Sequence, residues 1–162
     1  MAHAEECAHE LAQLARRTGI TVAVAESLTS GRLAATLGAA PNSADWFRGG
    51  VVAYSAEVKR TVLGAPDVPV VSRTAAEAMA EGVRSLLKSV AAVAVTGVGG
   101  PDPQDGEPAG SVWFAVATDD DVHAWHRQFD GEPEDVLEQT IACAVERLLT
   151  TARDLSADDH SV

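Results

Sequence analysis

Lysine, tyrosine and cysteine are scarce in this chain: two lysines stand against ten arginines, with one tyrosine and two cysteines in 162 residues. The two cysteines, Cys7 and Cys143, fall inside segments with the periodicity of amphipathic helices. We expect them to be reduced core residues, because a small buried thiol behaves as a hydrophobic side chain. A disulfide-stabilised scaffold is therefore not expected.

Long apolar runs are also missing. No segment approaches the roughly 20 apolar residues that span a bilayer, and the N-terminal MAHAEECAHE is acidic and has no hydrophobic signal region. With 46% hydrophobic residues and a mean hydropathy of +0.02, the composition is that of a soluble globular domain. We therefore expect a cytoplasmic protein that does not associate with membranes.

Positive charge is scarce as well, with 12 Lys and Arg against 24 Asp and Glu, a net charge of −12. This balance argues against nucleic acid as a partner but does not exclude a small anionic ligand in a locally basic pocket. No Cys-x-x-Cys or His-Glu-x-x-His spacing occurs. The acids Asp102, Asp105 and Glu107 do not follow the EF-hand pattern and indicate a solvated loop. No metal and no cofactor are expected.

One of the two lysines, Lys59, lies five positions after the only tyrosine, Tyr54, in VVAYSAEVKR. Arginine is effectively never deprotonated, whereas a desolvated lysine can lose its proton and act as a base. Most lysines are solvated surface charges. A catalytic role for Lys59 therefore needs a partner.

Hydrophobic periodicity alternates between extended and helical segments. Strands are predicted over residues 20–25, 51–54 and 90–95, and segments 111–118 and 122–129 predict a β-hairpin around an acidic turn. The run over residues 90–95 has the continuous apolar character of a strand covered on both faces. This alternation predicts an α/β domain.

Helices are predicted over residues 4–17, 29–37 and 55–63, from Thr74, and from Pro133. Thr74 and Glu77 form a predicted capping box. The predicted inward-facing residues of the last two helices are Met79, Val83, Leu86, Leu87, Leu137, Ile141, Ala144 and Leu148. No repeat or linker divides the chain, so we expect one domain over residues 1–154 and a disordered polar tail over residues 155–162.

Three loops fall at predicted strand ends, where open α/β sheets bind ligands. In the first, AESLTSG (Ala25 to Gly31), Ser27 lies where a strand passes into a helix. Free N–H groups of a helix start can hold an oxyanion or a phosphate. The alternative is that Ser27, Thr29 or Ser30 simply caps the helix.

The second loop, TGVGGPDPQDGEPAG (Thr96 to Gly110), holds five glycines and three prolines, which let its backbone approach a ligand closely. Its spacing fits neither a Rossmann fingerprint nor a Walker loop. In the third loop, NSADWFRGG (Asn42 to Gly50), Trp46 and Phe47 are expected to be packing residues beside a tight glycine turn.

Taken in order, AES-x-T-x-G, WFRGGVVAYSAEVK, TGVGGP and GSVWFA resemble the C-terminal domain of the CinA family, over about Leu11 to Leu149. The resemblance implies a single-domain layered sandwich in which helices flank a mixed β-sheet with a β-hairpin. Enzymatic members are nicotinamide-nucleotide amidohydrolases, which deamidate nicotinamide mononucleotide to nicotinic acid mononucleotide and ammonia. The resemblance also implies a homodimer or higher homo-oligomer.

By motif position, the resemblance implies that Ser27 is the nucleophile and Lys59 the base, with Tyr54 orienting the lysine or relaying its proton. The N–H groups of Leu28 and Thr29 would hold the oxyanion, and Arg32, Arg48 and the N–H groups of Gly97 to Gly100 are candidates for the phosphate. The expected substrate-binding residues are Leu28, Thr29, Ser30, Gly31, Arg32, Arg48, Thr96, Gly97, Gly99 and Gly100.

The chain departs from the family pattern at two places in the first loop. Where the enzymes usually read AESCTGG, this chain has Leu28 and Ser30, and the Cβ of Ser30 is expected to tighten the pocket. The glycine loop reads TGVGGP instead of the common SGIAGP. Two alternatives therefore stand beside the deamidase: a non-catalytic nucleotide-binding or interaction module, and a Ser–Lys hydrolase that acts on another amide or ester.

Overall fold

Two runs of alternating valine and alanine, β1 (Val22–Glu26) and β3 (Ala91–Gly97), form the centre of the fold, which a computed structural model describes over residues 2–159. They pair in parallel, and both are buried on both faces. Because side chains alternate along a strand, the valines of β1 face one side of the sheet and its alanines the other. The strand covered on both faces that was predicted over residues 90–95 is thus confirmed for residues 91–95, whereas Val90 precedes β3 and is 40% exposed.

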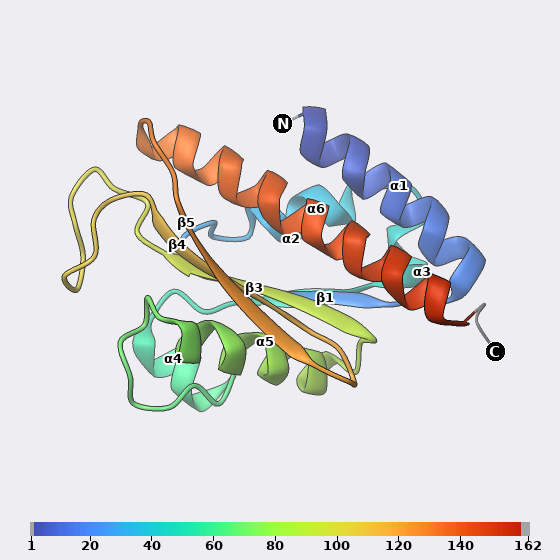
Figure 1. Ribbon diagram of the computed structural model, residues 1–162, viewed down its shortest axis with the longest axis horizontal. Helices are drawn as coiled ribbons and strands as arrows, with labels where there is room; N and C mark the ends of the chain where they lie inside the picture. The colour runs from blue at the N-terminus through green and yellow to red at the C-terminus, as the bar shows by residue number, and fades with distance from the viewer. Residues whose placement is uncertain (1, 160–162) are drawn as a thin grey trace.

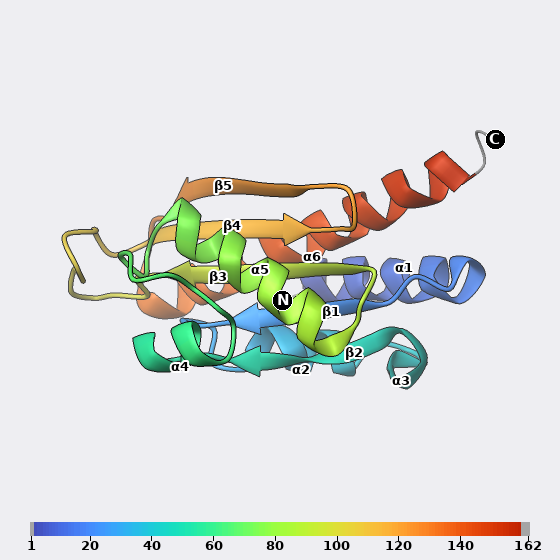
Figure 2. The same cartoon turned by 90° about the horizontal axis from the view of Figure 1, so that it is seen from below.

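The sheet is completed by β2 (Phe47–Val52), β4 (Ser111–Ala117) and β5 (Val122–Gln128), in the order β2-β1-β3-β4-β5 (Figure 2). β2 runs parallel to β1, whereas β4 and β5 are antiparallel and form the expected hairpin. The predicted class, an α/β sandwich around a mixed sheet, is confirmed.

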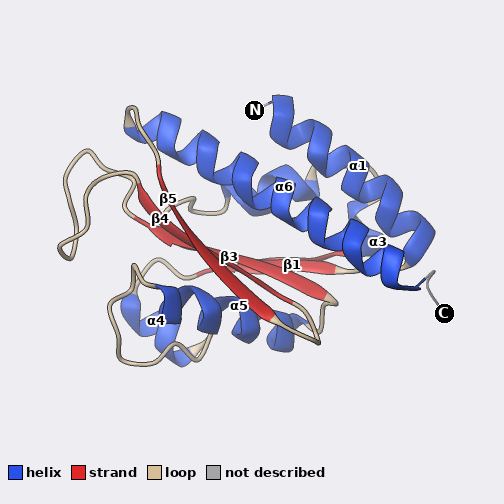
Figure 3. Cartoon of the chain, in the orientation of Figure 1, coloured by secondary structure: helices blue, strands red, loops and turns tan. Residues whose placement is uncertain are grey.

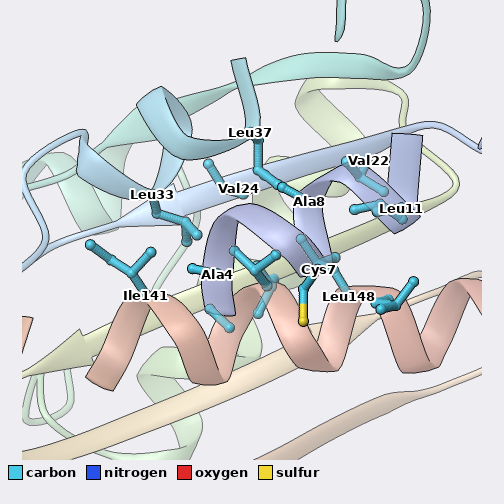
Figure 4. Close-up of a cluster of buried hydrophobic side chains, with 14 of the residues drawn as sticks. Ala4, Cys7, Ala8, Leu11, Val22, Val24, Leu33, Leu37, Ile141 and Leu148 are labelled. Atoms are coloured by element: carbon cyan, nitrogen blue, oxygen red, sulfur yellow. The ribbon is translucent and has the colours of Figure 1, made fainter. Parts of the chain in front are cut away.

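Helices cover both faces of the sheet (Figures 1 and 3). One face carries α1 (Ala2–Thr18), α2 (Arg32–Gly38), α6 (Pro133–Asp159) and the buried Trp46 of α3 (Ser43–Trp46). The core beneath them joins Leu11, Val24, Leu33, Ile141 and Leu148, as the close-up shows (Figure 4). The packing role predicted for Trp46 is confirmed.

The opposite face carries α4 (Ala56–Thr61) and α5 (Arg73–Leu87). Its core is rich in alanine from both the sheet and α5, which lets the helix pack close to the strands. Gly82 marks the tightest point, since a Cβ there would lie 2.1 Å from the carbonyl oxygen of Leu63. Both cysteines are free, Cys7 buried and Cys143 half-buried. No helix within residues 2–159 is long and apolar enough to cross a bilayer.

Several predicted boundaries were wrong. The segment 42–50, predicted as a loop, contains α3 and most of β2, which ends at Val52 instead of continuing to residue 54. The cap of α5 is Ser72, whose Oγ accepts a hydrogen bond from the Ala75 N–H at 3.2 Å, so Thr74 lies inside the first turn and the predicted capping box is absent. α6 continues to Asp159, so residues 155–159 are helical; residues 160–162 lie outside the described part.

One predicted core residue is exposed. Leu86 is 52% exposed, because the buried stripe of α5 passes from Val83 to the half-buried Leu87, four residues on, and misses the position three residues on. In α6, Ile141, Ala144 and Leu148 are fully buried as predicted, and Leu137 is partly buried.

Candidate active site

A cavity of about 480 Å³ lies at the carboxyl ends of β1 and β3. After β1 the chain crosses to β2 with α2 on one face, and after β2 it crosses to β3 with α5 on the other face. From β1 the chain leads to β2 on one side, whereas from β3 it leads to β4 on the other side, so the loops after β1 and β3 diverge. Such a switch point is where open α/β sheets hold ligands. The lining residues include Ser27, Leu28, Tyr54, Lys59, Val70, Val71, Leu137 and the segment 97–104.

Ser27 is the first residue after β1 and lies at the wall of this cavity, 7% exposed. Its carbonyl oxygen accepts the N–H of Ser30 at 3.1 Å, which closes a tight turn. Within the described residues its hydroxyl makes no hydrogen bond. The hydroxyl is therefore free to meet a ligand, and the prediction that Ser27 caps the helix is wrong.

The cap of α2 comes instead from Glu26, a fully buried residue that the sequence reasoning missed. Its carboxylate accepts the N–H groups of Gly31, Leu33 and Ala34 at 3.1, 2.8 and 2.9 Å. The anion-binding helix start expected at Thr29 is thus wrong, because α2 begins only at Arg32 and its first N–H groups are already paired.

Two N–H groups in the same turn stay unpaired. Within the described residues, neither Leu28 nor Thr29 donates its backbone N–H to a protein acceptor. Leu28 lines the cavity, whereas Thr29 is fully buried and its hydroxyl has no hydrogen-bond partner there. Leu28 therefore has an unpaired donor at the cavity, Thr29 lies outside the cavity lining, and the oxyanion role of both amides stays a prediction.

Ser30 and Gly31 set the shape of the turn. Both have left-handed backbone conformations, with φ of +53° for Ser30 and +101° for Gly31. This conformation is easy for glycine and unfavourable for serine, which gives a physical reason for the glycine usual at the Ser30 position. Ser30 is exposed and does not line the cavity, so the expected tightening of the pocket by its Cβ is wrong.

Lys59 lies on α4, which Ser55 caps by accepting the Val58 N–H at 3.2 Å. The side chain lines the cavity and is only 4% exposed. Desolvation lowers the pKa of its amine, and the charge of Asp105 opposes this by raising it. Within the described residues the amine makes no hydrogen bond or ion pair, so it faces the cavity without a protein partner.

Tyr54 lies at the mouth of the cavity and is 70% exposed. Its hydroxyl makes no hydrogen bond within the described chain, to Lys59 or to any other residue. The structure brings Ser27, Lys59 and Tyr54 to one cavity, and the orienting role of Tyr54 stays a prediction.

The glycine loop after β3 forms the opposite wall, at the same end of the molecule as α4 (Figure 1). A Cβ at Gly97 would lie 2.6 Å from the carbonyl oxygen of Ser111, so this position requires glycine. Within the described residues the N–H groups of Gly99 and Gly100 pair with no protein acceptor. Both glycines line the cavity, as predicted, and offer donors to an anion.

Four other predicted binding residues lie away from the cavity lining. Thr96 is fully buried and donates its hydroxyl to the Val70 carbonyl oxygen at 2.7 Å, which fixes the segment carrying two wall residues. Arg32 forms a two-pronged ion pair with Glu134, at 2.9 and 2.7 Å. Arg48 lies at the start of β2, and its Nε donates to the Leu87 carbonyl oxygen. Gly31 adopts the left-handed conformation that the turn requires. Lys59 is therefore the only cationic side chain among the described residues that line the cavity.

Comparison with known proteins agrees with this architecture. The family model of the CinA C-terminal domain matches residues 4–152, and the chain belongs to that family. A nicotinamide-nucleotide amidohydrolase PncC from Pseudomonas putida is 38% identical over 148 residues, which cover 88% of this chain and 92% of that protein. A CinA-like protein from Gemmatimonas aurantiaca is 38% identical over 146 residues, 86% of this chain and 34% of that longer protein.

Solved structures show the same fold. A CinA superfamily protein from Klebsiella pneumoniae superposes with a TM-score of 0.88 at 31% identity, covering 93% of this chain and 98% of that one. The competence/damage inducible protein CihA from Agrobacterium tumefaciens superposes with a TM-score of 0.86 at 29% identity, covering 91% and 94%.

Proposed function

We propose that this chain hydrolyses the carboxamide of nicotinamide mononucleotide to nicotinic acid mononucleotide and ammonia. The observation that carries the proposal is the presence of a free serine hydroxyl and a desolvated, unpaired lysine in one cavity. The Pseudomonas putida relative, which this chain matches over nearly its whole length, bears the name of that activity.

A carboxamide is a poor electrophile, so the serine must lose its proton as it attacks. Neutral Lys59 accepts the Ser27 Oγ proton while Oγ forms a bond to the amide carbon. The resulting oxyanion is held by the free N–H groups of Leu28 and Thr29. The C–N bond then breaks, and the lysine returns its proton to the departing ammonia.

Water completes the reaction. It attacks the acyl-enzyme ester and passes a proton to Lys59, which then protonates the released Ser27 Oγ. The products are the carboxylic acid and a regenerated serine, so every proton is accounted for by one lysine. Lysine serves here because its amine can exchange a proton in a desolvated site, whereas arginine cannot.

The phosphate of the nucleotide has to find donors elsewhere in the cavity. We propose the unpaired N–H groups of Gly99 and Gly100, because consecutive free amides in a glycine-rich turn form a concave anion site. Arg32 and Arg48 are not part of this proposal, since both are engaged outside the cavity. The expected homo-oligomer and cytoplasmic location stay predictions.

The test is ammonia release from nicotinamide mononucleotide by the purified protein, with Ser27→Ala and Lys59→Arg alongside. General acid–base catalysis typically contributes about 10²–10⁴ in rate, so we expect Lys59→Arg to lose at least about 100-fold in kcat. The matched control is Lys88→Arg, the same substitution at the other, exposed lysine, which should retain full activity.

Each outcome decides between functions. Binding of the mononucleotide without ammonia release would replace the proposal with a non-catalytic binding module. Acylation of Ser27 by a serine-directed probe, without reaction of the mononucleotide, would favour a hydrolase for another amide or ester. Near-normal activity in Lys59→Arg would remove the lysine from the mechanism.

A further inference from the structure

Glu26, the residue directly before Ser27, is a fully buried acid within an otherwise apolar strand. A buried carboxylate is costly unless its oxygens are hydrogen-bonded. Here Oε1 accepts the N–H groups of Gly31 and Leu33, and Oε2 accepts that of Ala34. No ion pair to Glu26 occurs within the described residues, so backbone amides alone stabilise it.

These bonds do more than cap a helix. A serine, threonine or aspartate at position 31 would cap α2 locally, but the cap here reaches from the end of β1, across the whole turn that carries Ser27. The backbone of Glu26 contributes a further bond, because its carbonyl oxygen accepts the Ala53 N–H at 2.8 Å. Ala53 precedes Tyr54 at the cavity mouth. One residue thus joins β1, the turn, α2 and the segment after β2.

The turn needs such a restraint. Ser30 and Gly31 both have left-handed conformations, and that region is unfavourable for a non-glycine residue such as Ser30. Without the carboxylate, the first amides of α2 would lack partners, and the turn could relax toward the ordinary helix start that the sequence alone predicts. That change would move the Ser27 Oγ and the free Leu28 and Thr29 amides together.

We propose that Glu26 is a positioning residue for the nucleophile: its buried carboxylate holds the Ser27 turn in the conformation that keeps Ser27 and Leu28, with its unpaired amide, at the cavity wall. This inference rests on the proposed serine chemistry and adds to it a residue that touches no substrate. It predicts that loss of the carboxylate lowers turnover more than it weakens substrate binding, since the glycine loop across the cavity is untouched.

Two variants remove the hydrogen bonds of the Glu26 carboxylate to different extents. Glu26→Gln keeps one acceptor oxygen, which can serve two of the three amides, but it turns an NH₂ group toward the third. Glu26→Ala removes all three bonds. Because small misplacements of reacting groups cost up to about 100-fold, we expect kcat to fall about 10-fold in Glu26→Gln and about 100-fold in Glu26→Ala, with KM changed less than about threefold.

The control is Leu11→Ala, a truncation in the core between α1 and α6, remote from the cavity. It lowers Tm through a cavity and should leave kcat unchanged. Amide hydrogen exchange is measured in parallel, and the peptides covering residues 27–34 should exchange faster in both Glu26 variants while those of α5 do not. If Glu26→Ala does not fold, Glu26→Gln alone decides.

The proposal is overturned if kcat in the Glu26 variants stays within threefold of wild type, or if Leu11→Ala loses kcat in the same proportion to its loss of Tm. A wild type that releases no ammonia would defeat the proposed function instead. Glu26 is then judged by the acylation rate of Ser27 with a fluorophosphonate. Slower acylation in Glu26→Gln supports positioning, and an unchanged acylation rate refutes it.

Discussion

At the scale of the residue, what Lys59 can do depends on what surrounds its amine. Burial lowers its pKa, which raises the fraction of neutral amine at a given pH, while the carboxylate of Asp105 raises the pKa and favours the charged form. A general base works best when its pKa lies near the working pH. Burial in the cavity wall and the charge of Asp105 in the glycine loop therefore shift the pKa of Lys59 in opposite directions.

The pH dependence of turnover tests this balance. We expect kcat for the mononucleotide to rise with pH as Lys59 loses its proton, and the rising limb to move to lower pH in Asp105→Asn, because that substitution removes a charge that raises the pKa. Asp102→Asn is the matched control: Asp102 also lines the cavity but is not among the groups that shift Lys59. Coincident profiles for wild type and Asp105→Asn would contradict the assignment of Lys59 as the base.

At the scale of the element, β1, β3 and the hairpin were predictable because their apolar runs and turns are local signals, whereas most of β2 was predicted as a loop. The start of α2 was not. The sequence offers Ser27, Thr29 and Ser30 as caps, and all three are statistically favoured there, yet the acceptor is Glu26, five to eight residues before the amides it binds. A lone acid at the end of the run ITVAVA was the available signal, and only the tertiary turn gives it meaning.

The buried face of α5 was also predicted only in part from the sequence, and the observed face can be tested. Met79 is fully buried while Leu86 is 52% exposed. We expect Met79→Ala to lower the free energy of unfolding by about 2–5 kcal/mol and Leu86→Ala to change it by no more than about 0.5 kcal/mol. Urea denaturation of both variants measures the difference. A large loss in Leu86→Ala would mean that the helix presents the face predicted from sequence.

The close packing of α5 against the backbone of Leu63, two residues after the end of α4, gives a second prediction at this scale. A Cβ at Gly82 would lie 2.1 Å from backbone, so Gly82→Ala must displace α5 and should cost about 1–3 kcal/mol of unfolding free energy. Gly38→Ala, also in a helix, meets nothing within 4 Å and should be neutral or stabilise by about 0.5–1 kcal/mol. Thermal unfolding should therefore show a lower Tm for Gly82→Ala and an unchanged or higher Tm for Gly38→Ala; an unchanged Tm in Gly82→Ala would contradict the close approach of α5.

At the scale of the whole molecule, the site joins segments that are far apart in sequence. The order of the motifs predicted that Ser27, Lys59, Tyr54 and the glycine loop belong to the site. The structure places all of them around one cavity, at the switch point where the connections after β1 and β3 diverge. Arg32 and Arg48, predicted to bind the phosphate, lie outside the cavity lining. Arg32 pairs with Glu134, and Arg48 donates to a backbone carbonyl oxygen. The sequence does not show which partner an arginine side chain will bind. Which charges stay unpaired is settled only by the complete fold.

Burial of Lys59 also links the stability of the whole domain to pH. Below its lowered pKa the amine is protonated in both states, and the folded chain bears the full cost of the buried charge. Between that pKa and the ordinary value of 10.5, the Lys59 amine is neutral in the folded state but protonated in the unfolded chain. The contribution of Lys59 to the free energy of unfolding therefore rises with pH in this range. Each unit of lowering corresponds to about 1.4 kcal/mol.

Lys59→Met removes this term while keeping an apolar stem of similar length. We expect the variant to be more stable than wild type at neutral pH, and its advantage to shrink as the pH is raised toward 10, because wild type then sheds the buried charge. Chemical denaturation of both proteins across this pH range measures the difference. Lys88→Met, at an exposed lysine, should show no such trend. A constant difference between Lys59→Met and wild type would mean that Lys59 keeps its ordinary pKa in the folded domain, and the proposed base would then be protonated at neutral pH.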